Sequence, residues 1–186
     1  SESYLRNREI EFQSYYNSFT LLPGQTQLEY LHLAKTSHLN KTLTYYDKIG
    51  VKRTLDLDST SFLIQKRSDL LYPTLAKLLK LQDLTQAKNL LRNFVNFYLE
   101  LIDQDILSPT TLEKNLGCSS ELKPIQIDVG RVLTPKDLQL SEIKVPLTQV
   151  YKSTSHMKKW LKVRSPELYL YLKQVEEELV TKRSKN

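Results

Sequence analysis

Residues 83–101, DLTQAKNLLRNFVNFYLEL, carry the most regular hydrophobic pattern in the sequence. Apolar side chains recur every three or four residues, which is the pattern of a helix with one buried face. They are Ala87, Leu90, Leu91, Phe94, Phe97, Tyr98 and Leu101. Asp83, with Gln86 three residues later, is typical of a capping box at a helix start. The stretch therefore predicts the strongest helix of the chain.

A polar loop and a short strand follow this helix. Residues 103–123 are mostly polar, which predicts a loop. Residues 125–127 predict a short strand, and this strand leads directly into Asp128-Val129-Gly130. The order is therefore a long helix, a polar loop, a short strand and an Asp-x-Gly turn.

The N-terminal part of the chain mixes helical and strand patterns. The expected elements are a helix over residues 3–20, a strand over 28–34 and a hairpin formed by 42–46 and 51–55. Pro23 and Gly24 end the first helix, and a four-residue turn with a terminal Gly joins the strands of the hairpin. Together with the long helix, these elements predict an α+β protein.

More helices are expected after the hairpin and at the C-terminus. Possible N-caps at residues 58–60 predict a helix that runs through Phe62 to Leu71 and that Pro73 ends or kinks. A later helix contains Trp160, and the last one begins at Ser165 and Pro166, a capping residue followed by proline at the first helical position. The fold is therefore expected to be mostly helical, with a small antiparallel sheet.

Composition excludes several classes of site. The chain has 186 residues with only four glycines, and no two of them have the spacing of a glycine-rich phosphate loop. One cysteine and three dispersed histidines do not form a zinc site of the usual spacing. No apolar run approaches the roughly 20 residues that span a bilayer. The sequence as given is therefore expected to be soluble.

The positive charge is concentrated at the C-terminal end. The net charge is +6, and residues 151–186 contribute nine Lys or Arg against four Glu. The remainder of the chain is nearly neutral, which argues against nucleic acid as a partner, because such proteins usually spread basic residues over a folded face. The basic residues around Trp160 suggest either a solvated helix face or a contact with an anionic membrane.

Asn115 and Asp128 are candidate magnesium ligands. An amide oxygen and a carboxylate suit Mg²⁺, which takes oxygen ligands. In protein kinases one such ligand is an Asn of the catalytic loop and another is the Asp of an Asp-Phe-Gly turn. Here the two residues are thirteen positions apart, the usual kinase spacing, and Gly130 follows Asp128 at the turn. The alternatives are an Asn bonded to its own loop and an ordinary turn acid.

At this point the sequence resembles the protein-kinase-like fold, and more closely a group of kinase-like proteins of chlamydial bacteria. The similar stretches are residues 46–50, 62–67, 71–73, 114–117, 124–131 and 159–161. The resemblance implies that residues 1–57 are the remnant of an N-lobe, with an αC-like helix and β-strands, and that residues 58–186 form a helical C-lobe-like domain. It also implies ATP and Mg²⁺ as cofactors, and a hydrophobic anchor and a nucleotide-facing Lys upstream of Ser1.

The chain departs from kinases in its catalytic loop. The base Asp of kinases lies about five residues before the Asn, a position that Thr110 occupies here. Nearby positions of the loop that are acidic in related proteins are Pro109 and Leu107. Asp103 and Asp105 are the remaining candidates for a catalytic acid, although their place at a helix end favours ordinary solvated residues. Glu9 or Glu11 is a candidate counterpart of the αC Glu.

Three functions follow from these observations. The first is a kinase-like fragment with a degenerate catalytic loop, a pseudokinase that binds a nucleotide or a partner and is not an enzyme by itself. The second is an interaction module that uses the basic C-terminal helices to contact a protein partner. The third is a divergent ATP-dependent phosphotransferase that needs an upstream segment. An upstream anchor would make the protein membrane-associated, and otherwise a bacterial cytoplasmic location is expected.

Overall fold

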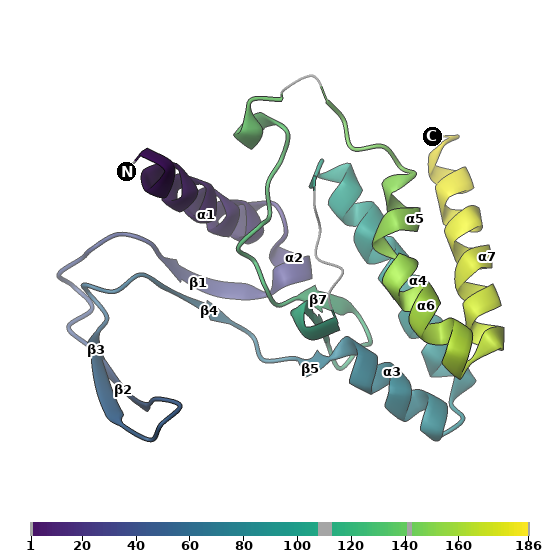
Figure 1. Cartoon of the computed structure of the whole chain (residues 1–186), viewed down its shortest axis with the longest axis horizontal. Coiled ribbons are helices and arrows are strands. Elements are labelled where there is room, and N and C mark those ends of the chain that lie inside the picture. The colour runs from purple at the N-terminus through teal and green to yellow at the C-terminus, as the bar shows by residue number, and fades with distance from the viewer. Residues whose placement is uncertain (1, 108–112, 141–142, 186) are drawn as a thin grey trace. The chain divides into compact units, whose positions relative to one another are not determined.

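The computed structural model describes residues 2–107, 113–140 and 143–185, and the chain is an α+β protein with small antiparallel sheets. Its contacts divide it into two compact units (Figure 1). The first comprises Ser1–Gln27 with Arg67–Asn186, and the second comprises Leu28–Lys66. The assignment of residues 1–57 and 58–186 to two kinase-like lobes stays a prediction.

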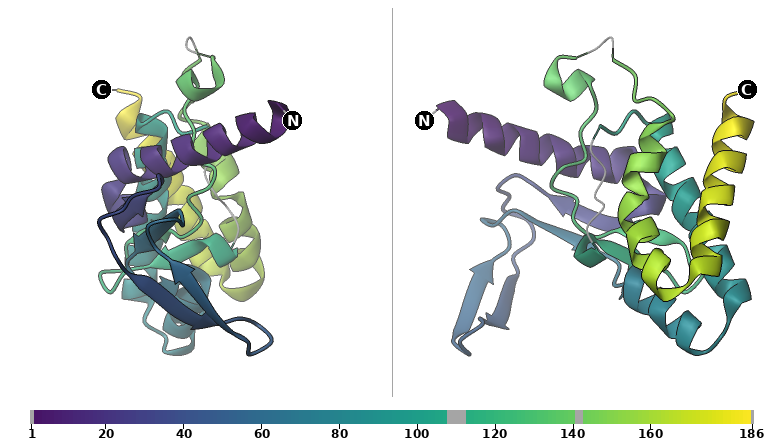
Figure 2. Two further views of the ribbon diagram at one scale, coloured as in Figure 1. Left: turned by 90° about the vertical axis from the view of Figure 1, so that its left-hand side faces the viewer. Right: turned by 45° about the vertical axis from the view of Figure 1, so that its right-hand side comes forward.

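Helix α4 (Leu84–Asp103) forms the centre of the first unit, as its pattern predicts. The carboxylate of Asp83 caps it by accepting a hydrogen bond from the N–H of Gln86 at 3.1 Å. The helix contacts α3 (Leu71–Lys80), α5 (Gln149–Ser153) and α7 (Pro166–Arg183), and Figures 1 and 2 show α4 and α7 side by side. Because neighbours surround it, α4 also buries residues outside the predicted stripe, namely Val95, Leu99 and Ile102.

The C-terminal helices pack on this core. Helix α6 (Ser155–Arg164) buries Met157 and Leu161 and contacts α7. The Ser165 hydroxyl accepts a hydrogen bond from the N–H of Leu168 at 3.4 Å, and Pro166 begins α7, which confirms the predicted helix start. In the described parts of the chain, we find no helix with both the length and the apolar character needed to cross a membrane.

A small sheet lies beside the core in the first unit. Strand β6 (Leu116–Cys118) pairs antiparallel with both β5 (Asp69–Leu70) and β7 (Pro124–Gln126). The prediction of a continuous loop over residues 103–123 was therefore wrong for β6, which is buried along its whole length. A strand of three residues is too short to show an alternating pattern in the sequence. Its pairing with β5 on one edge and β7 on the other stabilises it as a strand.

The prediction of a helix over residues 58–71 was also wrong. Strand β4 (Phe62–Gln65) pairs antiparallel with β1 (Leu28–His32), and the Phe62 ring stacks on His32 with their centroids 4.9 Å apart. Pairing with a distant strand overrides the local capping signals. Helix α3 begins only at Leu71, so Pro73 lies in its first turn, where the missing N–H breaks no helical hydrogen bond.

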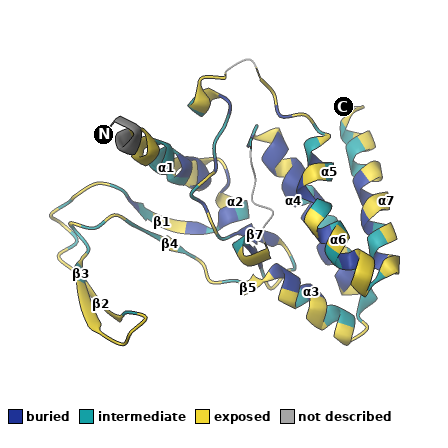
Figure 3. Cartoon of the chain, in the orientation of Figure 1, coloured by how far each residue is buried: buried dark blue, intermediate teal, exposed yellow. Residues whose placement is uncertain are grey.

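The second unit contains the predicted hairpin, formed by β2 (Thr42–Tyr46) and β3 (Lys52–Asp56). Tyr45 lies opposite Arg53, and Tyr46 lies opposite Lys52. Figure 3 shows that both strands are exposed along most of their length. Hydrogen bonds from the Thr36 hydroxyl and from backbone amides hold the pKa of Asp58 below its usual value, so this charged carboxylate fastens the loop before β2.

Two helices precede the first strand. Helix α1 (Glu2–Thr20) agrees with the predicted helix, and Pro23 begins a short helix, α2 (Pro23–Thr26), in place of a simple stop. Both belong to the first unit, together with the 3-10 turns η1 (Glu113–Asn115) and η2 (Lys136–Leu138). Helix α1 therefore folds with α3 to α7.

Candidate functional site

The hairpin of β6 and β7 brings Asn115 and Asp128 together. Leu116 pairs with Gln126, and the N–H of Ile127 extends the ladder by donating to the Asn115 carbonyl at 2.9 Å. Asn115 and the residues after Ile127 therefore leave the hairpin at the same end. The Asn115 side chain donates through Nδ2 to Oδ2 of Asp128 at 3.1 Å. The two predicted ligands are neighbours in space, although their role in binding stays a prediction.

Local hydrogen bonds orient the Asp128 carboxylate. Its Oδ1 accepts from the N–H of Gly130 at 3.1 Å, which closes a turn of the kind that Asp commonly forms. The buried side chain of Gln126 donates to the Asp128 carbonyl at 2.9 Å. The Asp128 side chain itself is exposed to solvent. Each carboxylate oxygen therefore has one protein donor and keeps a lone pair for another ligand.

Helix α1 docks against the segment that follows Asp128. The Ser14 hydroxyl donates to the Val129 carbonyl at 2.6 Å and accepts from the N–H of Val132 at 2.5 Å. Asn17 donates to the Val132 carbonyl at 2.9 Å and to Oδ2 of Asp137 at 2.7 Å. The hydrophobic pattern of the sequence did not predict this contact between α1 and the segment after Asp128, because polar side chains make it. The available signal was the spacing of Ser14, Asn17 and Ser18, which places three small polar residues on one helix face.

The same helix brings negative charge near Asp128. The Tyr15 hydroxyl donates to Oε1 of Glu11 at 2.6 Å. Burial, this hydrogen bond and the charges of Glu11 and Asp128 together raise the pKa of Tyr15 to about 12. Glu11, one of the two candidates for an αC-like Glu, therefore adds to the negative potential around Asp128, while Glu9 is exposed.

The candidate catalytic acids have partners elsewhere in the first unit. Asp103, at the end of α4, forms an ion pair with Arg183 of α7. Asp105 has a positive φ of 53°, and its Oδ1 accepts from the N–H of Val145 at 3.1 Å. Pro109 and Thr110 lie outside the described residues, and Leu107 is half-buried. The two acids thus have structural contacts of their own, and a catalytic role for either stays a prediction.

The thiol of Cys118 is poorly suited to act as a nucleophile. It is buried in β6, and burial, together with the charge of Asp69, raises its pKa to about 11. A nucleophilic cysteine needs a lowered pKa and access to solvent. This environment favours an inert thiol.

The basic C-terminal segment is only partly free to contact a partner. Lys158 forms an ion pair with the buried Glu176 of α7 at 3.0 Å. Trp160 packs edge-on against Tyr72 with the ring centroids 5.7 Å apart, and the Arg164 guanidinium lies 4.5 Å from the centre of the Trp160 ring. The exposed cations of α6 that remain are Lys159, Lys162 and Arg164.

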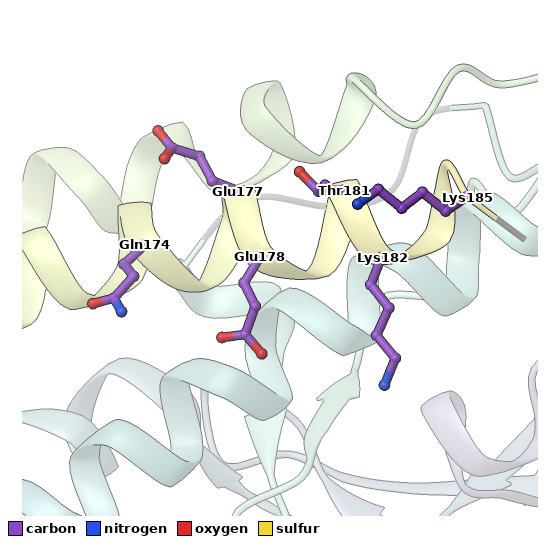
Figure 4. A pocket seen from close by; sticks show the side chains of 6 residues that line it. All are labelled: Gln174, Glu177, Glu178, Thr181, Lys182 and Lys185. Carbon is purple, nitrogen blue, oxygen red and sulfur yellow. The ribbon is translucent and has the colours of Figure 1, made fainter.

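A shallow depression lies along α7 and its C-terminal end. Figure 4 shows its six lining side chains, Gln174, Glu177, Glu178, Thr181, Lys182 and Lys185, all projecting from this one segment. Two acidic groups are followed along the chain by two basic ones, and Glu178 is paired with Arg92 of α4 at 2.8 Å. The depression therefore offers no convergent set of groups for a ligand.

Gly117 is required by close packing between β6 and the chain before β5. A Cβ at this position would overlap the Ser68 hydroxyl and would lie 3.3 Å from Cδ1 of Ile127. We expect Gly117→Ala to lower the free energy of unfolding by about 2 kcal/mol, a typical cost of overpacking. Urea denaturation measures this difference.

Gly130 provides the matched control for this prediction. A Cβ at Gly130 would meet Oδ1 of Asp128 at an ordinary distance of 3.4 Å. Gly130→Ala should therefore cost nothing, or stabilise by up to about 1 kcal/mol through the unfolded chain. Adding Ser68→Ala to Gly117→Ala should recover part of the loss. Equal losses for the two glycine variants would contradict the packing explanation.

Across the described ranges, no group of three or more His, Cys, Asp or Glu side chains could hold a metal ion, so any cation near Asp128 would need ligands beyond such a cluster. No protein-family model, curated protein or solved structure matches the chain. The resemblance to kinase-like proteins therefore depends on the sequence stretches themselves.

Proposed function

We propose that this chain is a kinase-like binding domain with a degenerate catalytic loop, which holds Mg²⁺ with a nucleotide such as ATP without transferring its phosphate. The observation that supports this most directly is the contact between Asn115 and Asp128, 3.1 Å from Nδ2 to Oδ2. An amide and a carboxylate at the end of one hairpin, after a long helix and a polar loop, match the order of the kinase ligands.

The donor set fits a magnesium ion that also binds phosphates. Mg²⁺ in nucleotide sites takes one or two protein ligands and completes its octahedron with phosphate oxygens and water. Asp128 supplies an exposed carboxylate, and Asn115 supplies an amide oxygen once its side chain turns this atom toward the ion. The charge of Glu11, which contributes to the raised pKa of Tyr15, adds to the attraction for a cation. The residues present are therefore compatible with a magnesium ion.

The surroundings of the candidate acids favour binding over phosphoryl transfer. A catalytic base must approach the hydroxyl whose proton it takes. Asp103 is paired with Arg183, and Asp105 bonds the backbone of Val145. These contacts give both acids a structural role, which supports a non-catalytic domain over an active phosphotransferase.

The proposal predicts a thermal shift that needs both cofactors. We expect Mg²⁺ and ATP together to raise the melting temperature of the full chain by about 5–10 °C when their concentration is about one hundred times the dissociation constant. Asp128→Asn should remove most of this shift, because it removes the charged ligand. Scanning fluorimetry with Mg²⁺ alone, ATP alone and both together makes the measurement.

Glu121→Gln is the matched control. Glu121 lies in the turn between β6 and β7, is exposed, and forms an ion pair with Lys123 at 2.9 Å. Its substitution removes the same charge from the same hairpin and should leave the shift intact. No shift in the parent chain, or equal loss in both variants, would refute the proposed site. Transfer of the γ-phosphate that Asp128→Asn abolishes would favour the phosphotransferase instead.

A further inference from the structure

The turn of the β2–β3 hairpin carries exposed apolar side chains at its end. We define the hairpin tip as residues 45–53. Within it Ile49 is 81% exposed and Tyr46 is 70% exposed, and Tyr45 and Val51 are also exposed. Figure 3 shows the exposed colour continuing along both strands. Apolar residues gathered in this way commonly mark an interaction site.

The backbone of the hairpin tip is already hydrogen-bonded within itself. The amides of Ile49 and Val51 donate to Oδ1 of Asp47 at 3.1 and 2.9 Å, and the N–H of Gly50 donates to the Asp47 carbonyl at 2.9 Å. The N–H of Asp47 donates to the Val51 carbonyl at 3.0 Å. Burying unpaired polar groups is costly, so these internal bonds lower the cost of moving the tip out of water.

The acid of the tip is neutralised locally. Oδ2 of Asp47 accepts a hydrogen bond from Nε of Arg53 at 3.1 Å. The Val51 amide, together with Arg53 and Ile49, holds the pKa of Asp47 below its usual value, so the carboxylate stays charged and paired. Lys48 and Lys52 add two further positive charges on either side of Ile49. The tip therefore combines exposed apolar side chains with a net positive charge.

We propose that the hairpin tip inserts into the surface of a membrane that contains anionic lipids. Ile49 enters the edge of the hydrocarbon, and Tyr46 lies at headgroup level, where amphipathic aromatic rings are enriched. Lys48 and Lys52 bind anionic headgroups while their methylene chains cover apolar surface. This contact uses no residue of the proposed nucleotide site, so either proposal can fail alone.

A membrane fits the tip better than a protein partner does. Stable protein interfaces bury about 800 Å² on each partner and are depleted in lysine at their centre. The tip offers a short turn with Lys48 directly beside Ile49, its most exposed apolar residue, and Lys52 three residues later. A fluid bilayer accepts such a shape without a complementary pocket.

The experiment is cosedimentation of the full chain with vesicles. We compare phosphatidylcholine alone with phosphatidylcholine containing about 30% phosphatidylserine, at low and high salt. The parent chain should bind only the anionic vesicles, and salt should weaken the binding. Ile49→Ser should weaken it about tenfold, and a Lys48→Gln, Lys52→Gln double variant by at least as much.

Val163→Ser is the matched control. Val163 is 84% exposed on α6 and lies between Lys162 and Arg164, so it has the same apolar and basic character in the first unit. Its substitution should leave vesicle binding unchanged. Circular dichroism of each variant confirms that the fold is retained.

Four results would overturn the proposal. They are no binding by the parent chain, equal binding to neutral vesicles, unchanged binding by Ile49→Ser, and loss of binding by Val163→Ser alone. Sedimentation velocity tests one more alternative. A dimer of the parent chain that Ile49→Ser dissociates would assign the tip to self-association and would also overturn membrane insertion.

Discussion

Glu176→Gln is expected to lower the free energy of unfolding by about 3 kcal/mol, the largest effect that we predict for a charged residue. Glu176 lies on the buried side of α7, and its side chain is 3% exposed. It accepts hydrogen bonds from Lys158 at 3.0 Å and from the Thr154 hydroxyl. The amide of Gln keeps the size of the side chain but leaves the Lys158 ammonium without its counter-charge.

The Lys158 side of the pair moderates the loss. Its side chain is 19% exposed, so part of the ammonium can reach water when the carboxylate is gone. Lys158 also donates to the Tyr151 carbonyl at 3.2 Å. For these reasons we expect the lower part of the range for broken buried pairs, which corresponds to a fall in melting temperature of about 10 °C. Guanidinium denaturation and calorimetry give the two values.

Glu177→Gln is the control on the neighbouring residue. Glu177 is exposed on α7, and its substitution should change stability by no more than about 0.5 kcal/mol. A Lys158→Met, Glu176→Leu double variant should regain much of the loss, because apolar packing can replace a buried pair. If Glu176→Gln and Glu177→Gln cost the same, the ion pair does not stabilise the packing of α6 on α7.

The sequence pattern predicted the elements that depend on a single buried face or on a local turn. Helix α4 has a repeated apolar face and an Asp83 cap, and the β2–β3 hairpin has a turn that Asp47 and Gly50 favour, so both were found. Strand β4 was missed because its partner β1 lies about thirty residues earlier in the chain. A run of four residues contains no period that separates a strand from a helix, and distant pairing decides between them.

The candidate site could be predicted only in part, for a similar reason. The spacing of Asn115 and Asp128 made them candidates, and a hairpin between them brings them into contact, but the first strand of that hairpin, β6, was not predicted. The burial of Ser14 was not predicted, because its partners are the backbone groups of Val129 and Val132 and not apolar side chains. Apolar Tyr16 and Phe19 on the same helix are exposed, so a search for hydrophobic faces chooses the wrong side of α1.

Ser14→Ala should therefore cost more than a surface hydroxyl usually does. Ser14 is fully buried and serves as both donor and acceptor between α1 and the chain after Asp128. Its removal leaves the Val129 carbonyl and the Val132 N–H without their main partner. Each buried group left unsatisfied costs about 1–3 kcal/mol, so we expect a loss of about 3 kcal/mol in urea denaturation.

Ser18→Ala is a close control, since Ser18 is equally buried on the same helix. Its hydroxyl donates mainly to the Ser14 carbonyl at 2.8 Å, within α1, and only distantly to the Val129 carbonyl at 3.4 Å. Its loss should cost about 1 kcal/mol, because the contact between the two segments remains. A cost in Ser18→Ala equal to that in Ser14→Ala would mean that burial alone, and not the bridge to residues 129–132, makes α1 stable.

Hydrogen exchange separates these explanations at a single amide. The Val132 N–H donates to Ser14 in the folded chain, so its exchange should become faster in Ser14→Ala by more than the change in global stability explains. In Ser18→Ala the same amide should follow global stability only. Because residues 129–132 continue directly from Asp128, a local opening confined to Ser14→Ala would show that α1 holds in place the segment on which the proposed magnesium ligand is mounted.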